Sequence, residues 1–289
     1  MVSVLAAGDN VVDCYQQLGG IFPGGNCVNV SVFAKRAGAT AGYLGAIADD
    51  SAGQVIQSAL MSEGVDLRRL RVLEGVTASC LIGLEHGERV FLGQNLGVSR
   101  FTPVEADYEY AAGFDAVHVG KSSGLDDYLA GFASVSALSY DFSQRFDDQA
   151  HLQTVAPMCH LASFSGAGLE EANVRRLVET AVDSGAEFAL VTMGSRGAML
   201  AHKSRIFRSV AVAHTNVVDT LGAGDTFIAR VLVGTLRGEE PEKVLADAAA
   251  RAAETCSRYG AFGYGDGGLD AVLMAPVYAP WWKGVIALP

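Results

Sequence analysis

The chain has 289 residues, 50% of them hydrophobic and 18% charged, which is enough apolar sequence to bury a large core in one α/β domain, or in one domain with a small appendage. Its formal net charge of −11 at pH 7, with no basic run, argues against a nucleic-acid-binding surface. Five scattered cysteines without a C-x-x-C pair, an N-terminus unlike a signal peptide and the lack of an apolar run of transmembrane length predict a cytoplasmic protein with free thiols and no membrane partner.

Short apolar runs alternate with helical patterns along most of the chain. The predicted elements are a strand at 3–7, a helix at 26–37, a strand at 41–47 and a helix from 50 or 51 to 64, then strands at 115–119, 137–141, 159–163 and 187–193 with helices near 125–135, 148–156 and 169–183. Such alternation predicts an α/β fold with a mostly parallel central sheet and helices on both faces.

Two stretches break this alternation. Residues 11–22 and 78–94 have the composition of strands without following helices, and the second reads as a hairpin that turns at His86-Gly87. We expect both to leave the main sheet and form a small β lid over its carboxyl edge. The pattern is lost after about residue 264, which divides the chain into a domain at 1–264 and a tail of uncertain structure at 265–289.

The most informative run is Asp-Thr-Leu-Gly-Ala-Gly-Asp-Thr-Phe at 219–227, followed by an apolar helix. The amides of Gly222, Ala223 and Gly224 open that helix, where N–H groups lack intrahelical acceptors and form an anion hole suited to a γ-phosphate. Asp225 then lies in the first turn, where it can accept a proton from a substrate hydroxyl during phosphoryl transfer. The alternative is a glycine-rich turn whose aspartates only complement the helix dipole.

A second run opens the first long helix. Gly24 and Gly25 let the backbone approach a polar ligand closely, and Asn29 on the first turns can hydrogen-bond sugar hydroxyls. Asp9 and Asp13 follow the first strand, at the edge where open α/β sheets bind ligands. From the residues alone, an ordinary helix-entry turn and solvated loop aspartates stay open as readings.

A third run, Thr-Met-Gly-Ser-Arg-Gly at 192–197, ends a strand and matches neither a Rossmann nor a Walker nucleotide motif. Taken alone it predicts a tight turn between strands. The histidines show no metal-ligand spacing, and His118, in an apolar strand, is interpreted as a satisfied core residue.

Together these runs resemble the PfkB (ribokinase-like) family of carbohydrate kinases over roughly residues 3–263. The family's carboxyl-side signature, Asp-x-x-Gly-Ala-Gly-Asp, is matched by residues 219–225. Its amino-side signature is matched by Gly24, Gly25 and Asn29, with glycines and an aspartate at family-like spacing further on. The resemblance implies a ribokinase-like fold and ATP-dependent phosphorylation of a sugar hydroxyl with Mg²⁺.

The resemblance also implies roles for individual residues. These are Asp225 as the catalytic base; Gly222, Ala223 and Gly224 as the anion hole; Asp13, Gly25 and Asn29 as sugar-binding positions; Thr192, Gly194 and Gly197 as the turn that lines ATP; and Asp219 with the Leu221 carbonyl as the place where some members hold a monovalent cation such as K⁺. The reading of the residues adds Asp9 and Gly24 to the predicted sugar site. It leaves open a homodimer formed through the lid.

Within the family, residues 8–30 and 140–143 are most similar to fructoselysine 6-kinases, while fructokinases and ribokinases stay open. The chain departs from many relatives at 163–166, where Ser-Phe-Ser-Gly replaces an Asn-x-x-Glu motif that organises Mg²⁺. Arg145 matches an arginine that reaches the phosphates in bacterial fructokinases, or is a surface arginine after a strand. The alternative of another class is a silent sugar- or nucleotide-binding protein with the same fold.

Overall fold

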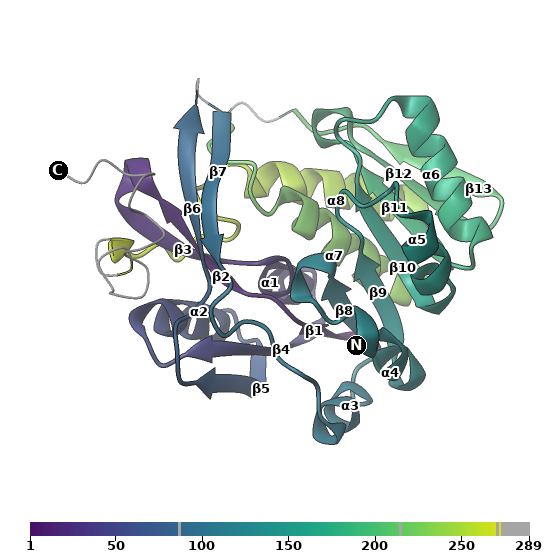
Figure 1. Cartoon of the computed structure of the whole chain (residues 1–289). Helices are drawn as coiled ribbons and strands as arrows, with labels where there is room; N and C mark the ends of the chain where they lie inside the picture. The colour runs from purple at the N-terminus through teal and green to yellow at the C-terminus, as the bar shows by residue number, and fades with distance from the viewer. Residues whose placement is uncertain (86–87, 214–215, 270–271, 273–289) are drawn as a thin grey trace.

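The computed structural model describes residues 1–85, 88–213, 216–269 and 272 (Figure 1). Its main sheet has nine strands in the order β13-β12-β11-β10-β9-β8-β1-β4-β5. Neighbours from β11 to β5 run parallel, whereas β12 pairs antiparallel with both β11 and β13. The strands are β1 (Ser3–Ala7), β4 (Thr40–Ala48), β5 (Asp66–Leu73), β8 (Ala116–Gly120), β9 (Ala137–Asp141), β10 (Cys159–Ser165), β11 (Phe188–Thr192), β12 (Ala198–His202) and β13 (Arg205–Ser209).

Helices cover both faces of this sheet, as the alternation of elements predicts. Successive side chains of β1 show why, because Val4 and Ala6 enter one apolar core while Leu5 and Ala7 enter the other. The first core is closed by α1 (Asn26–Arg36), α2 (Ser51–Ser62), α7 (Ala223–Leu236) and α8 (Pro241–Thr255). The second is closed by α3 (Glu105–Ala111), α4 (Leu129–Val135), α5 (Gln149–Val155) and α6 (Glu171–Asp183).

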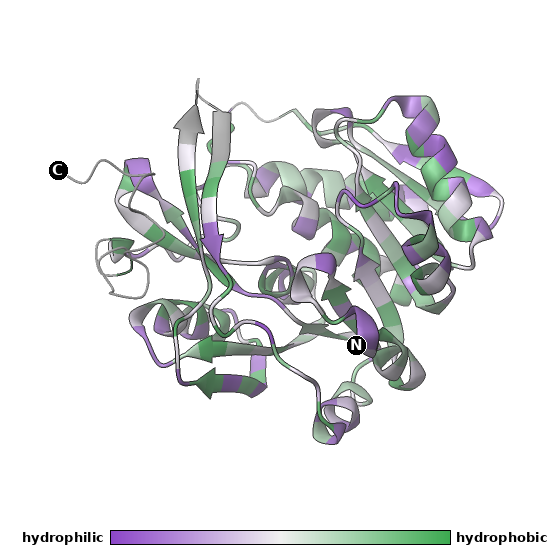
Figure 2. Ribbon diagram, viewed as in Figure 1, coloured by the Kyte–Doolittle hydropathy of each residue, from purple (hydrophilic) through white to green (hydrophobic). Residues whose placement is uncertain are grey.

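Hydropathy follows this layering. Figure 2 shows the central strands mostly hydrophobic, while hydrophilic residues gather on the helices and loops around them. The amphipathic pattern of α6 is typical, since Val174, Leu177, Val178 and Ala181 are buried on one side of the helix. In the described part of the chain, no helix is long and apolar enough to span a membrane.

The two stretches that break the alternation form the predicted lid, a second sheet with the order β3-β2-β6-β7. Its strands are β2 (Val11–Tyr15), β3 (Gly20–Gly24), β6 (Ser79–Glu85) and β7 (Glu88–Asn95), and Figure 1 shows β6 and β7 rising away from the main sheet. β6 and β7 pair antiparallel, as a hairpin requires, but the turn expected at 86–87 lies outside the described residues.

The end of the described chain returns to this lid. Asp266 forms a β-bridge with Ile21, and Leu269 and Val272 are buried in the first core. The tail that the sequence leaves without an element from residue 265 therefore begins as an ordered contact with β3. The remainder of that tail lies outside the described residues, so the predicted division at residue 264 stays a prediction.

The predicted strands and helices are all present with shifts of a few residues at their ends, apart from the helix expected near 125–135. That segment is a 3₁₀ turn (Asp126–Tyr128) followed by α4. The sequence did not predict β5, the β12–β13 hairpin, α3 or α8. β5 has the sequence DLRRLRVL, and its three arginines obscure the apolar pattern of a strand. They are tolerated because β5 is an edge strand that is covered on only one face.

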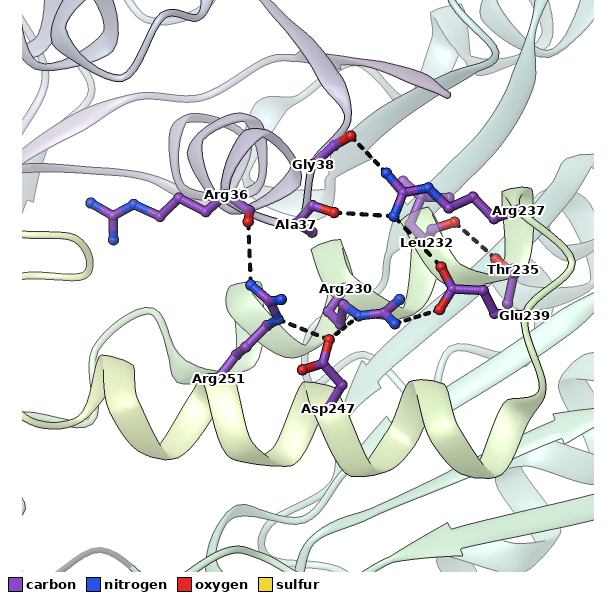
Figure 3. Close-up of polar contacts among 10 residues, drawn as sticks. All are labelled: Arg36, Ala37, Gly38, Arg230, Leu232, Thr235, Arg237, Glu239, Asp247 and Arg251. Atoms are coloured by element: carbon purple, nitrogen blue, oxygen red, sulfur yellow. Dashed lines mark hydrogen bonds and ion pairs between the residues drawn. The ribbon is translucent and has the colours of Figure 1, made fainter. Parts of the chain in front are cut away.

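Helices α1 and α7 pack against each other, and arginines join their carboxyl ends (Figure 3). Arg237 donates to the carbonyls of Ala37 and Gly38, at 3.2 and 2.6 Å, just beyond the end of α1. Arg251 of α8 donates to the carbonyl of Arg36 at 3.2 Å. These guanidinium groups satisfy carbonyls that a helix end leaves without intrahelical donors.

Below them lies Arg230, only 8% exposed, which bridges two acidic side chains (Figure 3). Its Nε donates to Asp247 of α8 and its Nη2 donates to Glu239 after α7, both at 2.5 Å. Asp247 also accepts from Arg251 at 2.9 Å. The network ties α1, α7 and α8 together at the end of the helix pair away from the ligand-binding edge of the sheet.

Candidate active site

The amino ends of α1 and α7 meet beside the carboxyl ends of β8 and β9. Asp225, in the first turn of α7, accepts hydrogen bonds from the side-chain amides of two α1 residues: Asn26 at 2.8 Å and Asn29 at 2.6 Å. The same Asn26 amide donates to Asp141, the last residue of β9, at 3.0 Å. Parallel strands bring their carboxyl ends to one edge, which is where open α/β sheets place ligands.

Burial and like charge raise the pKa values of both acids. The pKa of Asp225 rises to about 7, first because the group is removed from water and then because Asp141 and Asp9 are near, against the opposing hydrogen bonds from Asn29 and Asn26. Burial raises the pKa of Asp141 to about 6. Within the described residues, no lysine or arginine forms an ion pair with any of these three acids. A carboxylate with a pKa near neutrality suits a general base.

The predicted anion hole lies next to Asp225, the predicted base. Gly222 caps α7 with φ 77°, a left-handed conformation, and a Cβ there would meet Ala261 at 2.4 Å, so only glycine fits. Gly224 is exposed, and beyond its chain neighbours and the backbone of its own helix no described atom lies within 4 Å of the point that a Cβ would occupy. The Ala223 N–H makes a long bond, 3.3 Å, to the carbonyl of Thr220. The turn thus leaves open space at the glycine next to the base.

Asp219 shapes the same turn. Its carboxylate accepts the backbone N–H of Leu221 at 3.0 Å, the backbone N–H of Gly260 at 3.2 Å and the hydroxyl of Tyr15 from lid strand β2. The side chain of Leu221 packs against the small apolar cluster of the lid. Asp219 therefore fastens the lid and the segment after α8 to the turn that begins α7, and its assignment to a monovalent cation stays a prediction.

The lid brings Asp13 to the same side. Val12 and Cys14 of β2 enter the main core, so Asp13 lies on the opposite face of the strand, with Tyr15. Its carboxylate crosses Gly24, where a Cβ would lie 2.2 Å from Asp13 Oδ2. Gly24, which the sequence analysis linked to a ligand, therefore leaves space for the Asp13 carboxylate.

Asp9 and Gly25 shape the entry into α1. Asp9 accepts the Asn26 backbone N–H and the Ser123 hydroxyl, both at 2.9 Å, so its carboxylate satisfies one of the free amides at the start of the helix. Gly25 has φ 103°, and a Cβ there would lie 2.8 Å from the Asn10 backbone. Asp9 therefore holds the helix end, and the sugar-binding role expected from its place after the first strand stays a prediction.

The third run forms the predicted tight turn. Thr192 ends β11, a 3₁₀ turn covers Gly194–Arg196, and β12 follows. Gly197, with φ 87°, lies against the backbone of Ser209, where a Cβ would approach to 2.0 Å. Arg145 is exposed, four residues beyond the end of β9, with no described hydrogen bond from its guanidinium group.

Arg196, which the sequence analysis did not single out, has a definite role. Its guanidinium donates to the carbonyls of Gly166, Ala167 and Leu169, at 3.3, 2.9 and 2.7 Å. These carbonyls belong to the loop that follows β10, which begins with the last residue of the Ser-Phe-Ser-Gly stretch at 163–166. A clamp from the adjacent turn thus fixes that loop here.

Three further residues of the site were not assigned from the sequence. Asn26 and Asp141 lie inside recognised runs, yet only their contact across the sheet identifies them. His118 is a satisfied core residue, as interpreted, but one of its partners is Asn26, at 2.9 Å. The signal available in the sequence was His118 itself, a polar residue inside the apolar strand 115–119.

Comparisons with known proteins agree with this geometry. A family model described as pfkB family carbohydrate kinase matches residues 6–263. The chain is 35% identical to fructosamine kinase FrlD of Bacillus subtilis, over 91% of this chain and 94% of the relative. It is 33% identical to fructoselysine 6-kinase of Escherichia coli, over 91% of this chain and all of the relative.

Solved structures show the same fold. Ribokinase of Arabidopsis thaliana, complexed with ribose and ATP, superimposes with a TM-score of 0.78 at 19% identity, covering 91% of this chain and 96% of the other. A putative ribokinase II of E. coli, in complex with ATP and Mg²⁺, has a TM-score of 0.76 at 19% identity, over 91% of this chain and 95% of the other. The ribokinase-like fold expected from the sequence is confirmed, and the chain belongs to the pfkB family of carbohydrate kinases.

Proposed function

We propose that this kinase transfers the γ-phosphoryl group of ATP to the 6-hydroxyl of fructoselysine or a related fructosamine. The observation that carries the chemistry is Asp225, a carboxylate with a pKa of about 7 beside the open glycine turn at the start of α7. The sugar class rests on the similarity to fructosamine and fructoselysine kinases, which extends over 91% of the chain.

In the proposed reaction, Asp225 orients the sugar hydroxyl and accepts its proton while the oxygen bonds to phosphorus. The transferring phosphoryl group spreads charge over its outer oxygens, and the amides of Gly222, Ala223 and Gly224 face that charge at the positive end of α7. Asn29 holds Asp225 through its Nδ2, and its buried Oδ1 has no hydrogen-bond partner in the described chain. Asp13 and Asn29 are the proposed contacts to the other sugar hydroxyls.

The residues present fit ATP, and we propose that Mg²⁺ is bound by the nucleotide's phosphates. Thr192, Gly194 and Gly197 form a tight turn. A Cβ on Gly194 would meet only the Ala167 side chain, at 3.8 Å, so this glycine leaves room for a nucleotide to approach the backbone. Arg145 is proposed to reach the phosphates from its exposed place after β9. No cluster of acidic, histidine or cysteine side chains for a metal occurs in the described residues, so Mg²⁺ would arrive bound to ATP and neutralise phosphate charge. Asp219 and the Leu221 carbonyl remain the proposed K⁺ site.

An ATP-consumption panel tests this function. Fructoselysine, psicoselysine, fructose, ribose and adenosine would each be supplied with MgATP, and the phosphorylated carbon identified by NMR. We expect kcat/KM for fructoselysine to exceed that for fructose at least about tenfold, because an amino-acid arm needs to contribute only about 1.4 kcal/mol of transition-state binding for that difference. Equal values would make the protein a plain ketose kinase, and a preference for ribose or adenosine would refute the substrate assignment.

We further propose a homodimer that pairs through the lid, since β7 lies at the edge of the lid sheet and, among the described strands, pairs only with β6. Light scattering after gel filtration measures the mass directly. A monomer at micromolar concentration would refute the dimer. The five free cysteines, four of them buried, support a reducing compartment such as the cytoplasm.

A further inference from the structure

The side chain of Asn26 is held at each of its polar atoms. Its Nδ2 carries two hydrogens, and both are used: one bonds to Asp225 at 2.8 Å and the other to Asp141 at 3.0 Å. Its Oδ1 lies 2.9 Å from Nε2 of His118. Because both acids only accept when ionised, the amide nitrogen must face them, and the amide oxygen must face the histidine.

This arrangement determines which nitrogen of His118 carries the proton. An amide oxygen only accepts, so Nε2 of His118 donates, and Nδ1 accepts from the hydroxyl of Ser139 at 2.9 Å. His118 is fully buried in β8, and burial lowers its pKa to about 3, so the ring stays neutral at any pH where the enzyme works. The hydrogen bonds thus form a chain that runs in one direction. Ser139 donates to His118, His118 donates to Asn26, and Asn26 donates to the carboxylates of Asp141 and Asp225.

The backbone around Asn26 is fitted to this chain. A Cβ on Gly120, at the end of β8, would lie 2.3 Å from Asn26 Oδ1, so the glycine provides the space that the amide occupies. The Asn26 backbone N–H donates to Asp9 at 2.9 Å. The residue thus has its main chain anchored after β1 and its side chain anchored between β8 and β9.

We propose that Asn26 and His118 are positioning residues that hold the Asp225 carboxylate ionised and aimed at the substrate hydroxyl. Asp225 faces Asp141 at the end of β9 and Asp9 after β1, with amide donors from α1 and no described cation to compensate. Asp141 is buried and Asp225 partly buried, and two acids bonded to one amide nitrogen tend to share a proton unless donors stabilise both charges. Asn26 supplies a donor to each, and His118 prevents the amide from turning over. The catalytic part of this proposal rests on the proposed kinase function.

The test compares His118→Phe, which removes the donor to Asn26, with His118→Gln, whose side-chain amide restores a donor of similar reach. His160→Phe is the matched control, because His160 lies in β10 and bonds Thr235 near the far end of α7, at 3.0 Å. Carboxyl ¹³C NMR of aspartate-labelled protein without ligands would follow the titration of Asp225, whose signal is identified by its loss in Asp225→Asn.

We expect His118→Phe to raise the titration midpoint of Asp225 by about one unit or more and to lower kcat at least about tenfold, with KM for ATP unchanged. His118→Gln should return both toward wild type, and His160→Phe should change neither. An unchanged midpoint and kcat in His118→Phe would overturn the proposal. So would losses that His118→Gln does not rescue, since they would indicate packing alone.

If His118→Phe does not fold, Asn26→Ala replaces it, because Asn26 is only partly buried. It should raise the Asp225 midpoint at least as far, and an unchanged midpoint would overturn the proposal. The titration needs no substrate. If the wild type phosphorylates no sugar, the proposed function fails, while the NMR comparison still decides whether the relay holds the carboxylate.

Discussion

The two ends of the α1–α7 helix pair use acidic residues in opposite ways. At the amino end, Asp225 and Asp141 are held by neutral amides, and burial raises the pKa of each. At the carboxyl end, Asp247 is paired with Arg230 and Arg251, whose hydrogen bonds lower its pKa despite some burial (Figure 3). Near the amino end of the pair, Asp225 of α7 and Asp141 of β9 therefore titrate close to neutral pH, whereas Asp247 of α8, near the carboxyl end, stays ionised.

The two ends differ in how their acids contribute to the free energy of unfolding at neutral pH. A carboxylate whose native pKa is raised above its usual value binds a proton more tightly in the folded state, so its stabilising effect is lost as pH rises through about 7. An ion-paired acid such as Asp247 behaves in the opposite way, because its lowered pKa favours the folded state at neutral pH. We expect substitutions at the amino end to change turnover and those at the carboxyl end to change stability.

The largest effect is expected for Asp225→Asn, which should lower kcat by about a thousandfold or more while KM for ATP changes little. The fold should persist, because the Asn29 Oδ1, which has no described partner, can accept from the new amide after Asn29 turns over. At pH 8 the thermal midpoint should equal or exceed that of wild type, since the variant removes a charge beside Asp141. Near-full turnover in this variant would refute the assignment of the base.

Gly224→Val should lower kcat about a hundredfold, because its branched side chain enters the open space where the phosphoryl group is proposed to lie. Beyond the backbone of α7 itself, no described atom lies within 4 Å of the Cβ position, so the folded protein should be little affected beyond a helix-propensity cost. Ala223→Ser serves as a mild control in the same turn. Calorimetry that finds normal ATP binding together with a normal rate would place the phosphate elsewhere.

Asp13→Ala should raise the apparent KM for the sugar by about ten- to a hundredfold, as expected for a charge-assisted hydrogen bond worth about 1.5–3 kcal/mol. The KM for ATP should barely change, because Asp13 lies in the lid sheet and not beside the Thr192–Gly197 turn. Initial rates with each substrate varied in turn measure both constants. A parallel rise in both would show that Asp13 only supports the lid.

Arg230→Met is expected to lower the free energy of unfolding by about 1–3 kcal/mol, from lost hydrogen bonds to Asp247 and Glu239. Asp247 and Glu239 are both partly exposed to solvent, and Asp247 retains its hydrogen bond from Arg251. The loss of stability should therefore be smaller than for a fully buried ion pair. Urea unfolding measures it, with Arg175→Met on the exposed face of α6 as a control. A large fall in kcat without a loss of stability would break the contrast between the two ends.

Much of the architecture followed from local pattern, and most of the site did not. The runs at 24–30 and 219–227 predicted Asp225, its glycines and Asn29, because such spacings are local in the chain. The contacts of Asn26 with Asp141 and with His118 span 115 and 92 positions, so no local pattern contains them. The arginine-rich β5 was missed for a related reason: its partners, not its composition, make it a strand.

The pH dependence of kcat/KM for the sugar tests the central claim, that an acid held by neutral amides is the base. With Mg²⁺ and ATP saturating, the account predicts that log kcat/KM falls with a slope of about one below pH 7, because Asp225 must be ionised to accept the proton. A parallel titration of the Asp225 carboxyl by ¹³C NMR should give the same midpoint. A kcat/KM that stays constant down to pH 5 would contradict it.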